Sequence, residues 1–213
     1  MRQKHILFIT TGDIAQIATM KRAFGLAKPL ANLGWIVEII AEETNENKKR
    51  YQLECDSRIR IHYFPKSNVF NEVNFKNNLI AELSPNYIYL CSFSVRNYVL
   101  KRQSCLIIEH SELQSSIQTQ KYVKRLMAYI LESVSVIYAD KLVCASKYLQ
   151  EYFMGLSRKL IFASKDIHYS PYAYSNEVIN TPPFLKESLK KKYNNQFICL
   201  YMGSMAENYG FLK

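Results

Sequence analysis

The chain has 213 residues, of which 48% are hydrophobic and 22% are charged, a composition typical of a folded globular protein and not of a disordered chain. This length holds one large domain, or one and a half of average size. The net charge of +10 fits an anionic partner, such as a membrane surface, a nucleotide phosphate or nucleic acid. A basic surface with no special partner is the alternative.

Membrane spans, signal peptides and disulfide frameworks are all disfavoured. The most apolar long stretch, residues 127–139, is interrupted by Glu132 and two serines, whereas a span needs ~20 apolar residues. The apolar run at residues 5–9 is too short for a signal core. The five cysteines form no CxxC pair and no zinc spacing, which favours a reducing cytosol. We therefore expect a cytoplasmic protein.

The first predicted elements are a strand, a helix and two further strands. Residues 5–10 form a buried strand that runs into the tight loop Thr11-Gly12-Asp13. In the helix that follows, the apolar residues share one face: Met20, Phe24, Ala27, Ala31 and Leu33. Gly34 is expected to end this helix, and Pro29 to kink or divide it. Residues 35–41 and 58–64 are the second and third strands.

The alternation then continues toward the C-terminus. A helix is expected over 69–83, ended by Ser84-Pro85, then a strand at 87–91, a short helix at 94–102 and a strand at 105–108. The longest helix, 117–139, is expected to bury its apolar face, which consists of Val123, Leu126, Ile130, Val134 and Ile137. A strand at 141–145 precedes a helix that extends to Tyr152 and has Ser146 as its N-cap.

Strands that alternate with helices predict an α/β fold, a Rossmann-like parallel sheet with helices on both faces. This domain is expected to occupy residues 1–174. Residues 175–196 are expected to form a linker with a basic helix, and residues 197–213 the first strand and loop of a second domain. Because a lone strand cannot bury its own apolar faces, the sequence is expected to be truncated.

Candidate binding residues follow three of the predicted strands, because ligands of open parallel sheets bind beyond the carboxyl ends of the strands. After the first strand, Gly12 allows close backbone approach, and the helix N-terminus next to Asp13 would attract an anion. A plain tight turn is the alternative. After the strand at 141–145, Ser146 is a candidate ligand contact in addition to its capping role.

The third candidate is Glu109-His110-Ser111-Glu112, directly after the strand at 105–108. A histidine between Glu109 and Glu112 can hydrogen-bond sugar hydroxyls or move a proton. A histidine satisfied by its neighbours is the alternative. His110 is therefore a candidate catalytic residue.

Two basic segments are candidates for anionic surfaces. Residues 188–193 and the group Lys121, Tyr122, Lys124 and Arg125 could meet anionic lipid or nucleic acid. Such runs are usually solvated faces, which is the reading we prefer for residues 188–193.

Several segments, taken in their order along the chain, resemble the N-terminal half of GT-B glycosyltransferases, in particular the retaining family 4 group. Residues 5–13 look like that family's opening strand and loop, and residues 26–37 are similar to its L-x-x-L-G-H-x-V segment, with Trp35 in place of the histidine. Residues 107–110 fall where the family places its acceptor-side histidine, and residues 132–148 are similar to its E…A-D-x-(apolar)-S-x-x-L stretch. Residues 200–204, with Tyr209 and Gly210, look like the opening of its C-terminal domain.

The resemblance implies a hexosyltransferase that moves a sugar from a nucleotide-sugar to a glycan or lipid-linked acceptor of the cell envelope or a polysaccharide. It implies no cofactor and no bound metal, with His110 near the transferred sugar, Gly12 near the donor phosphates or the acceptor, and Gly203 and Ser204 in the donor domain. It also implies cytoplasmic work, with peripheral contact to an anionic inner membrane as one option. Because the donor-binding part lies beyond Lys213, the chain alone is expected not to turn over.

Departures from the family pattern keep other readings open. Tyr209 stands where the family often has a cation, and Ser170-Pro171-Tyr172-Ala173 lacks the usual Asn-Gly after proline. The alternatives are a non-catalytic α/β binding module and, with less support, a nucleic-acid-binding protein, although no nucleic-acid partner is expected. An NAD-dependent oxidoreductase is disfavoured because GxGxxG is missing.

Overall fold

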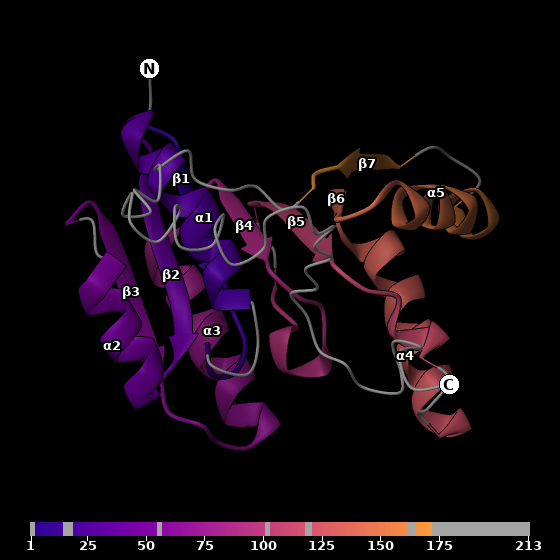
Figure 1. Cartoon of the computed structure of the whole chain (residues 1–213), viewed down its shortest axis with the longest axis horizontal. Coiled ribbons are helices and arrows are strands. Elements are labelled where there is room, and N and C mark those ends of the chain that lie inside the picture. The colour runs from indigo at the N-terminus through magenta and orange to yellow at the C-terminus, as the bar shows by residue number, and fades with distance from the viewer. Residues whose placement is uncertain are drawn as a thin grey trace, which may run out of the picture.

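The computed structural model describes residues 3–14, 19–54, 57–100, 103–117, 121–161 and 165–171. These residues contain one seven-stranded sheet whose neighbouring strands are all parallel, in the order β3-β2-β1-β4-β5-β6-β7 (Figure 1). The strands are β1 (His5–Ile9), β2 (Ile36–Glu42), β3 (Ile59–Phe64), β4 (Tyr87–Leu90), β5 (Cys105–His110), β6 (Lys141–Cys144) and β7 (Asp166–Tyr169). The helices are α1 (Thr19–Asn32), α2 (Asn45–Glu54), α3 (Val69–Leu83), α4 (Tyr122–Tyr138) and α5 (Lys147–Ile161), with 3-10 turns η1 (Val95–Asn97) and η2 (Gln114–Ser116). The predicted Rossmann-like α/β fold is confirmed.

The strand order reverses between β1 and β4. From β1 the chain proceeds outward to β2 and β3, then returns through α3 to β4 on the other side of β1. In open α/β sheets such a reversal point opens a crevice at the carboxyl ends of the strands, where ligands bind. The loops after β1 and β4 therefore flank the candidate site.

Two apolar cores lie on opposite faces of the sheet. One contains Leu7, Ile40 and Ile88 from the strands together with apolar residues of α3, α4 and α5. The other contains Phe8, Ile39 and apolar residues of α1. Because successive side chains of a strand point to opposite faces, neighbouring residues such as Leu7 and Phe8 join different cores. Continuous apolar strands are what a sheet covered on both faces requires.

The first helix agrees with the sequence pattern apart from two points. Met20, Phe24, Ala27 and Ala31 are buried as expected, whereas Leu33 is 74% exposed, because it lies beyond the end of α1. Gly34 closes the helix in the left-handed conformation, with φ of 81°. Pro29 lies inside α1 without dividing it. It falls in the last turn, where only a few residues of the helix follow the backbone hydrogen bond that proline cannot make.

Two later helices differ in length from their expectation. The helix expected over 94–102 is a single 3-10 turn, η1, in the described part of that segment. The helix expected to extend to Tyr152 runs to Ile161 as α5, and Ser146 caps it by accepting a hydrogen bond from the Leu149 amide at 3.2 Å. α3 ends before Ser84, as predicted. α2, a largely polar helix, was not predicted.

The expectation for the long helix was wrong about which face is buried. In α4 the residues Val123, Leu126, Ile130, Val134 and Ile137 are all exposed, by 37% to 69%. Its buried side carries Glu132, Ser135 and Val136 instead. Periodicity identifies residues that share a face, but it does not say on which side of the helix the rest of the protein lies.

The expected linker with basic helix (175–196) and the expected second-domain strand and loop (197–213), with Gly203 and Ser204, lie outside the described residues.

Candidate functional site

The loops after β1 and β4 meet through a pair of hydroxyl groups. Thr11 Oγ1 lies 3.2 Å from Ser92 Oγ, at the point where the strand order reverses. Thr19 at the start of α1 holds this loop twice: its hydroxyl accepts from the Thr11 amide at 3.1 Å and donates to the Thr11 carbonyl at 2.8 Å. The carboxyl edge between β1 and β4 is thus a fixed polar surface.

A buried asparagine holds the Gly12 loop in place through three hydrogen bonds. Gly12 has φ of 66°, a left-handed conformation that glycine adopts without steric cost. Asn47 of α2 donates to the Gly12 carbonyl at 3.1 Å and to the Glu42 carbonyl at 2.8 Å, and it accepts from the Ile14 amide at 2.9 Å. Asn47 is fully buried, so the loop that contains Gly12 and Asp13 is held in one shape.

A second clamp holds the loop after β4. Asn97 Nδ2 donates to the carbonyl and hydroxyl oxygens of Ser92, at 3.1 and 3.3 Å. Lys76 Nζ donates to Asn97 Oδ1 and to the Arg96 carbonyl, both at 2.8 Å. Burial lowers the pKa of Lys76 to about 8. Ser92 is therefore positioned by a chain of contacts that begins at a lysine inside the protein.

Glu109 belongs to a buried ion pair on the α1 face of the sheet. Its Oε1 lies 2.6 Å from Arg22 Nε, and the Tyr89 hydroxyl donates to its Oε2 at 2.8 Å. Arg22 also donates to the Ser170 carbonyl at 3.1 Å. Burial raises the pKa of Glu109 above its ordinary value, and the Arg22 cation opposes that shift. Arg22 thereby ties α1 to β5 and to the end of β7.

His110 lies on the opposite face, against α4 and α5. Its Nε2 is 2.8 Å from Ser135 Oγ, and its ring stacks on Phe153 with centroids 4.1 Å apart. Ser135 donates its single hydroxyl hydrogen to the Glu132 carbonyl at 2.7 Å. His110 Nε2 therefore carries the proton and donates to Ser135, which leaves Nδ1 as the basic nitrogen of the neutral ring. Burial lowers the pKa of His110 to about 4.

The structure separates the residues that the sequence groups around His110. Glu109 and His110 point to opposite faces of the sheet, as neighbours in a strand must. Glu112 is exposed beyond β5 and accepts a hydrogen bond from Gln114 at 3.0 Å. Ser146, after β6, is half-buried and engaged as the cap of α5. All of these residues stand at the carboxyl edge of the sheet, but they do not form one carboxylate–histidine cluster.

Glu132 fixes the loop that follows His110. Its carboxylate accepts from the Ser115 amide at 3.0 Å and from the Ser115 hydroxyl at 2.7 Å. Arg125 donates to the Ser115 carbonyl at 3.0 Å. The buried polar side of α4 therefore positions η2, and with it the rim of the candidate site.

Arg22, Asn47 and Asn97 are site-shaping residues that the sequence analysis missed. Asn47 lies in a helix that was not predicted, and Arg22 stands off the apolar stripe of α1, so neither carries a sequence signal. A carboxylate at the end of an apolar strand, such as Glu109, does indicate that some buried donor must pair with it. It does not indicate which one.

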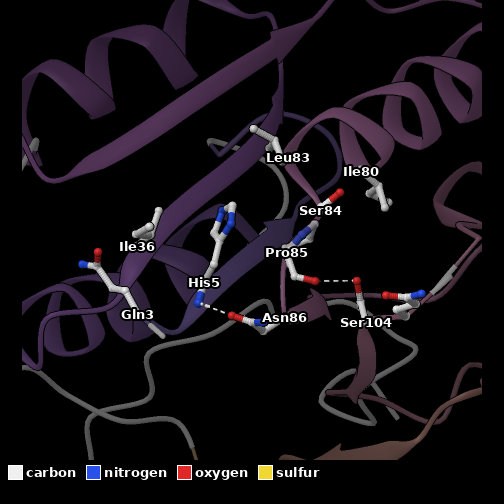
Figure 2. Close-up of a pocket in the computed structure, with 10 residues that line it drawn as sticks. Gln3, His5, Ile36, Ile80, Leu83, Ser84, Pro85, Asn86 and Ser104 are labelled. Carbon is white, nitrogen blue, oxygen red and sulfur yellow. Dashed lines mark hydrogen bonds between the residues drawn. The ribbon is translucent and has the colours of Figure 1, made fainter. Parts of the chain in front are cut away.

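A cavity of about 740 Å³ lies at the opposite, amino-terminal edge of the sheet. Figure 2 shows His5, Asn86 and Ser104 among its lining residues, with the His5 amide donating to Asn86 Oδ1 at 2.9 Å and the Ser104 hydroxyl donating to the Pro85 carbonyl at 2.6 Å. Many of its polar groups are already engaged in the wall. It lies at the other end of β1 and β4 from Thr11 and Ser92.

The described residues hold neither a metal-binding cluster nor a membrane-spanning helix. That part of the chain has no group of three or more histidine, cysteine, aspartate or glutamate side chains arranged to hold a metal ion. None of its helices combines the length and apolarity needed to cross a bilayer.

No family model matches the sequence, and neither does any curated protein. Solved structures do resemble the fold. A glycosyltransferase from Rickettsia africae matches with a TM-score of 0.55 at 13% identity, over 90% of this chain and 50% of that one. Arabidopsis thaliana UGT89C1, solved with UDP-L-rhamnose, matches with a TM-score of 0.55 at 13% identity, over 82% of this chain and 54% of that one.

A putative UDP-N-acetylglucosamine 2-epimerase from Listeria monocytogenes matches with a TM-score of 0.51 at 13% identity, over 73% of this chain and 43% of that one. The chain thus spans about half the length of the solved proteins it matches. These likenesses confirm the GT-B-type fold of the resemblance, whereas membership of family 4 stays a prediction.

Proposed function

We propose that this chain is the acceptor-side portion of a glycosyltransferase that moves a hexose from a nucleotide-sugar to a glycan or lipid-linked acceptor. The observation that carries the proposal is the fixed polar edge at the strand reversal, where Thr11 and Ser92 meet above the clamped Gly12 loop. Ligands of this fold class bind at that place. The fold is shared with two glycosyltransferases, one of which was solved with a UDP-sugar.

In this proposal each residue at the strand ends has its own role. Gly12 lets the donor phosphates or the acceptor approach the backbone, and Asp13 and Ser92 offer hydrogen bonds to hydroxyl groups. His110, neutral at pH 7, accepts a hydrogen bond from a sugar hydroxyl through Nδ1. A proton-transfer role would have to use that same nitrogen, because Nε2 is engaged by Ser135.

Glu109, Glu112 and Ser146 have different parts in the proposal. Glu112, at the exposed rim, can meet an acceptor from solvent with the carboxylate oxygen that Gln114 does not engage. Glu109 contributes through the Arg22 pair, which fixes the end of β5. Ser146 adds a contact from the end of β6. Gly203 and Ser204 would serve the donor side.

The proposal includes a cytoplasmic location at the inner face of a membrane, where lipid-linked acceptors are found, and no cofactor other than the donor substrate. The net charge of +10 supports such a placement. Nucleic acid is not an expected partner.

Ligand binding and turnover by the 213-residue chain test the proposal together. A panel of UDP-, GDP- and TDP-sugars and of glycan and lipid-linked acceptors is added to the chain, and the thermal unfolding midpoint is recorded. We expect a rise with at least one class of ligand, and no transfer of radiolabelled sugar, because in this proposal the main donor contacts belong to the donor side of the enzyme.

Three results would count against this function. Sugar transfer by the chain alone would contradict its assignment as the acceptor side only. No response to any nucleotide-sugar or acceptor would favour a non-catalytic module. Oligonucleotide binding that weakens steeply with salt would indicate a nucleic-acid-binding protein.

A further inference from the structure

The α4 helix presents a continuous apolar face to solvent. Its exposed large side chains recur at intervals of three and four residues, which places them on one side of a helix. They are Val123, Leu126, Met127, Ile130, Val134 and Ile137, and each is at least 37% exposed. We call these six residues the α4 face. Over 15 residues it is about 22 Å long, and an apolar patch of this kind marks an interaction site.

The α4 helix exposes its apolar side because the polar residues of its other side make contacts inside the protein. Glu132 and Ser135 face the protein, where they hold Ser115 and His110. Rotating α4 to bury the α4 face would leave these contacts unmade and would expose the groups they satisfy. The exposed apolar side is therefore built into the fold.

Tyrosines border the α4 face and extend it. Tyr122 and Tyr129 are exposed along one side of it. At its C-terminal end, Tyr138 stacks on Tyr98 with centroids 5.4 Å apart. Tyr98 belongs to the β4–β5 connection, in which Val95 and Leu100 are also exposed. Tyrosine suits a boundary between water and an apolar phase, because its ring is apolar and its hydroxyl is polar.

The charge carried by the helix is entirely positive where it meets solvent. Lys121 and Lys124 are exposed at its N-terminal end, and Arg125 is half-buried beside them. The one acidic residue of α4, Glu132, is buried against Ser115. Figure 1 shows α4 at the β6–β7 side of the molecule, with its lower part extending past the sheet.

We propose that α4 is an interfacial helix that lies in the headgroup layer of an anionic lipid bilayer, with the α4 face inserted and the exposed Lys121 and Lys124 on the lipid phosphates. An apolar face, bordering tyrosines and basic ends are the features of such helices. A second copy of the chain is a poorer partner, because each copy carries a net charge of +10 and the two would repel. This inference rests on the proposed membrane placement and not on sugar transfer.

Co-sedimentation with lipid vesicles tests the inference. We expect the full chain to bind vesicles of phosphatidylglycerol and phosphatidylcholine, to bind pure phosphatidylcholine about tenfold or more weakly, and to lose affinity between low salt and about 0.5 M salt. The double variant Leu126→Glu/Ile130→Glu should reduce binding about tenfold or more, and Lys121→Glu/Lys124→Glu should do the same.

Matched controls come from other exposed positions. Phe70, 81% exposed on α3, gives Phe70→Glu as the apolar control, and the exposed Lys66 gives Lys66→Glu as the charge control; both should bind as the unaltered chain does. Because the altered side chains of α4 are exposed, their unfolding midpoints should stay unchanged. Val123→Glu, in the first turn of α4, repeats the apolar test at a second place.

The inference is overturned if the full chain does not bind anionic vesicles, or if the α4 variants bind as well as the controls. It is also overturned if light scattering shows a dimer that only the α4 variants abolish, since the α4 face then belongs to a second copy. Nucleotide-sugar and acceptor binding should be unaffected by the α4 variants. A failure of vesicle binding would therefore contradict this inference without contradicting the proposed sugar transfer.

Discussion

His110 and Glu109 are neighbours in β5 with unrelated surroundings. One is a neutral imidazole between Ser135 and Phe153, and the other is a carboxylate paired with Arg22. The sequence correctly placed both at a strand end. It could not supply their partners, because Arg22 is 87 residues away along the chain from Glu109 and lies in a different kind of element. Long-range pairing of buried charges leaves no local pattern.

The burial of His110 predicts that stability depends on pH. The unfolded chain protonates this histidine below a pKa near 6.5, whereas in the folded protein the pKa is about 4. Between those values the unfolded state binds more protons, so stability should fall as the pH is lowered through that window. From pH 7 to pH 5 the loss attributable to His110 is about 2 kcal/mol.

Urea unfolding of the unaltered chain and of His110→Gln at both pH values measures this loss. Glutamine can still donate to Ser135 but does not titrate, so the variant should lose about 2 kcal/mol less than the unaltered chain over the same interval. Equal losses would mean that His110 is not buried as a neutral group.

At the scale of elements, local patterns predict strands and helix ends better than they predict which side of a helix faces the protein. The stop of α3 before Ser84-Pro85 and the Gly34 end of α1 follow from local chemistry, and both agree with the structure. The orientation of α4 does not follow from local chemistry, because it is set by what Glu132 and Ser135 must reach. The prediction of a helix over 94–102 was wrong for a similar reason, because the buried Asn97 makes hydrogen bonds with Ser92 and Lys76.

Substitution by alanine is expected to have opposite effects on stability at two glycines, one inside α1 and one at its end. Gly34 has φ of 81°, and Gly25 lies inside α1; an added Cβ meets nothing within 4 Å at either position. Gly34→Ala should therefore destabilise by about 1–2 kcal/mol through backbone strain alone. Gly25→Ala should stabilise by about 0.5–1 kcal/mol, since alanine loses less entropy in a helix.

Thermal or urea unfolding of the two variants measures the effects side by side. Because neither change adds a clash, the difference in sign isolates backbone conformation. A Gly34→Ala variant as stable as the unaltered chain would show that the αL end of α1 is not required.

At the scale of the whole molecule, the alternation of strands and helices was enough to predict a parallel sheet. It did not reveal the strand order, because sequence order does not say on which side of β1 the chain resumes after β3. That order decides where the site lies: β4 beside β1 brings Ser92 to Thr11, although 81 residues separate them.

The central claim is that this polar edge binds the sugar ligands. The most direct test is an NMR titration of the ¹⁵N-labelled chain with the nucleotide-sugars and acceptors described above. We predict that amide shifts change at Thr11, Gly12, Ser92 and Ser146, at the carboxyl edge, and not at Gln3 and Asn86 around the opposite cavity. Changes confined to Gln3 and Asn86, or no change with any of these ligands, would contradict it.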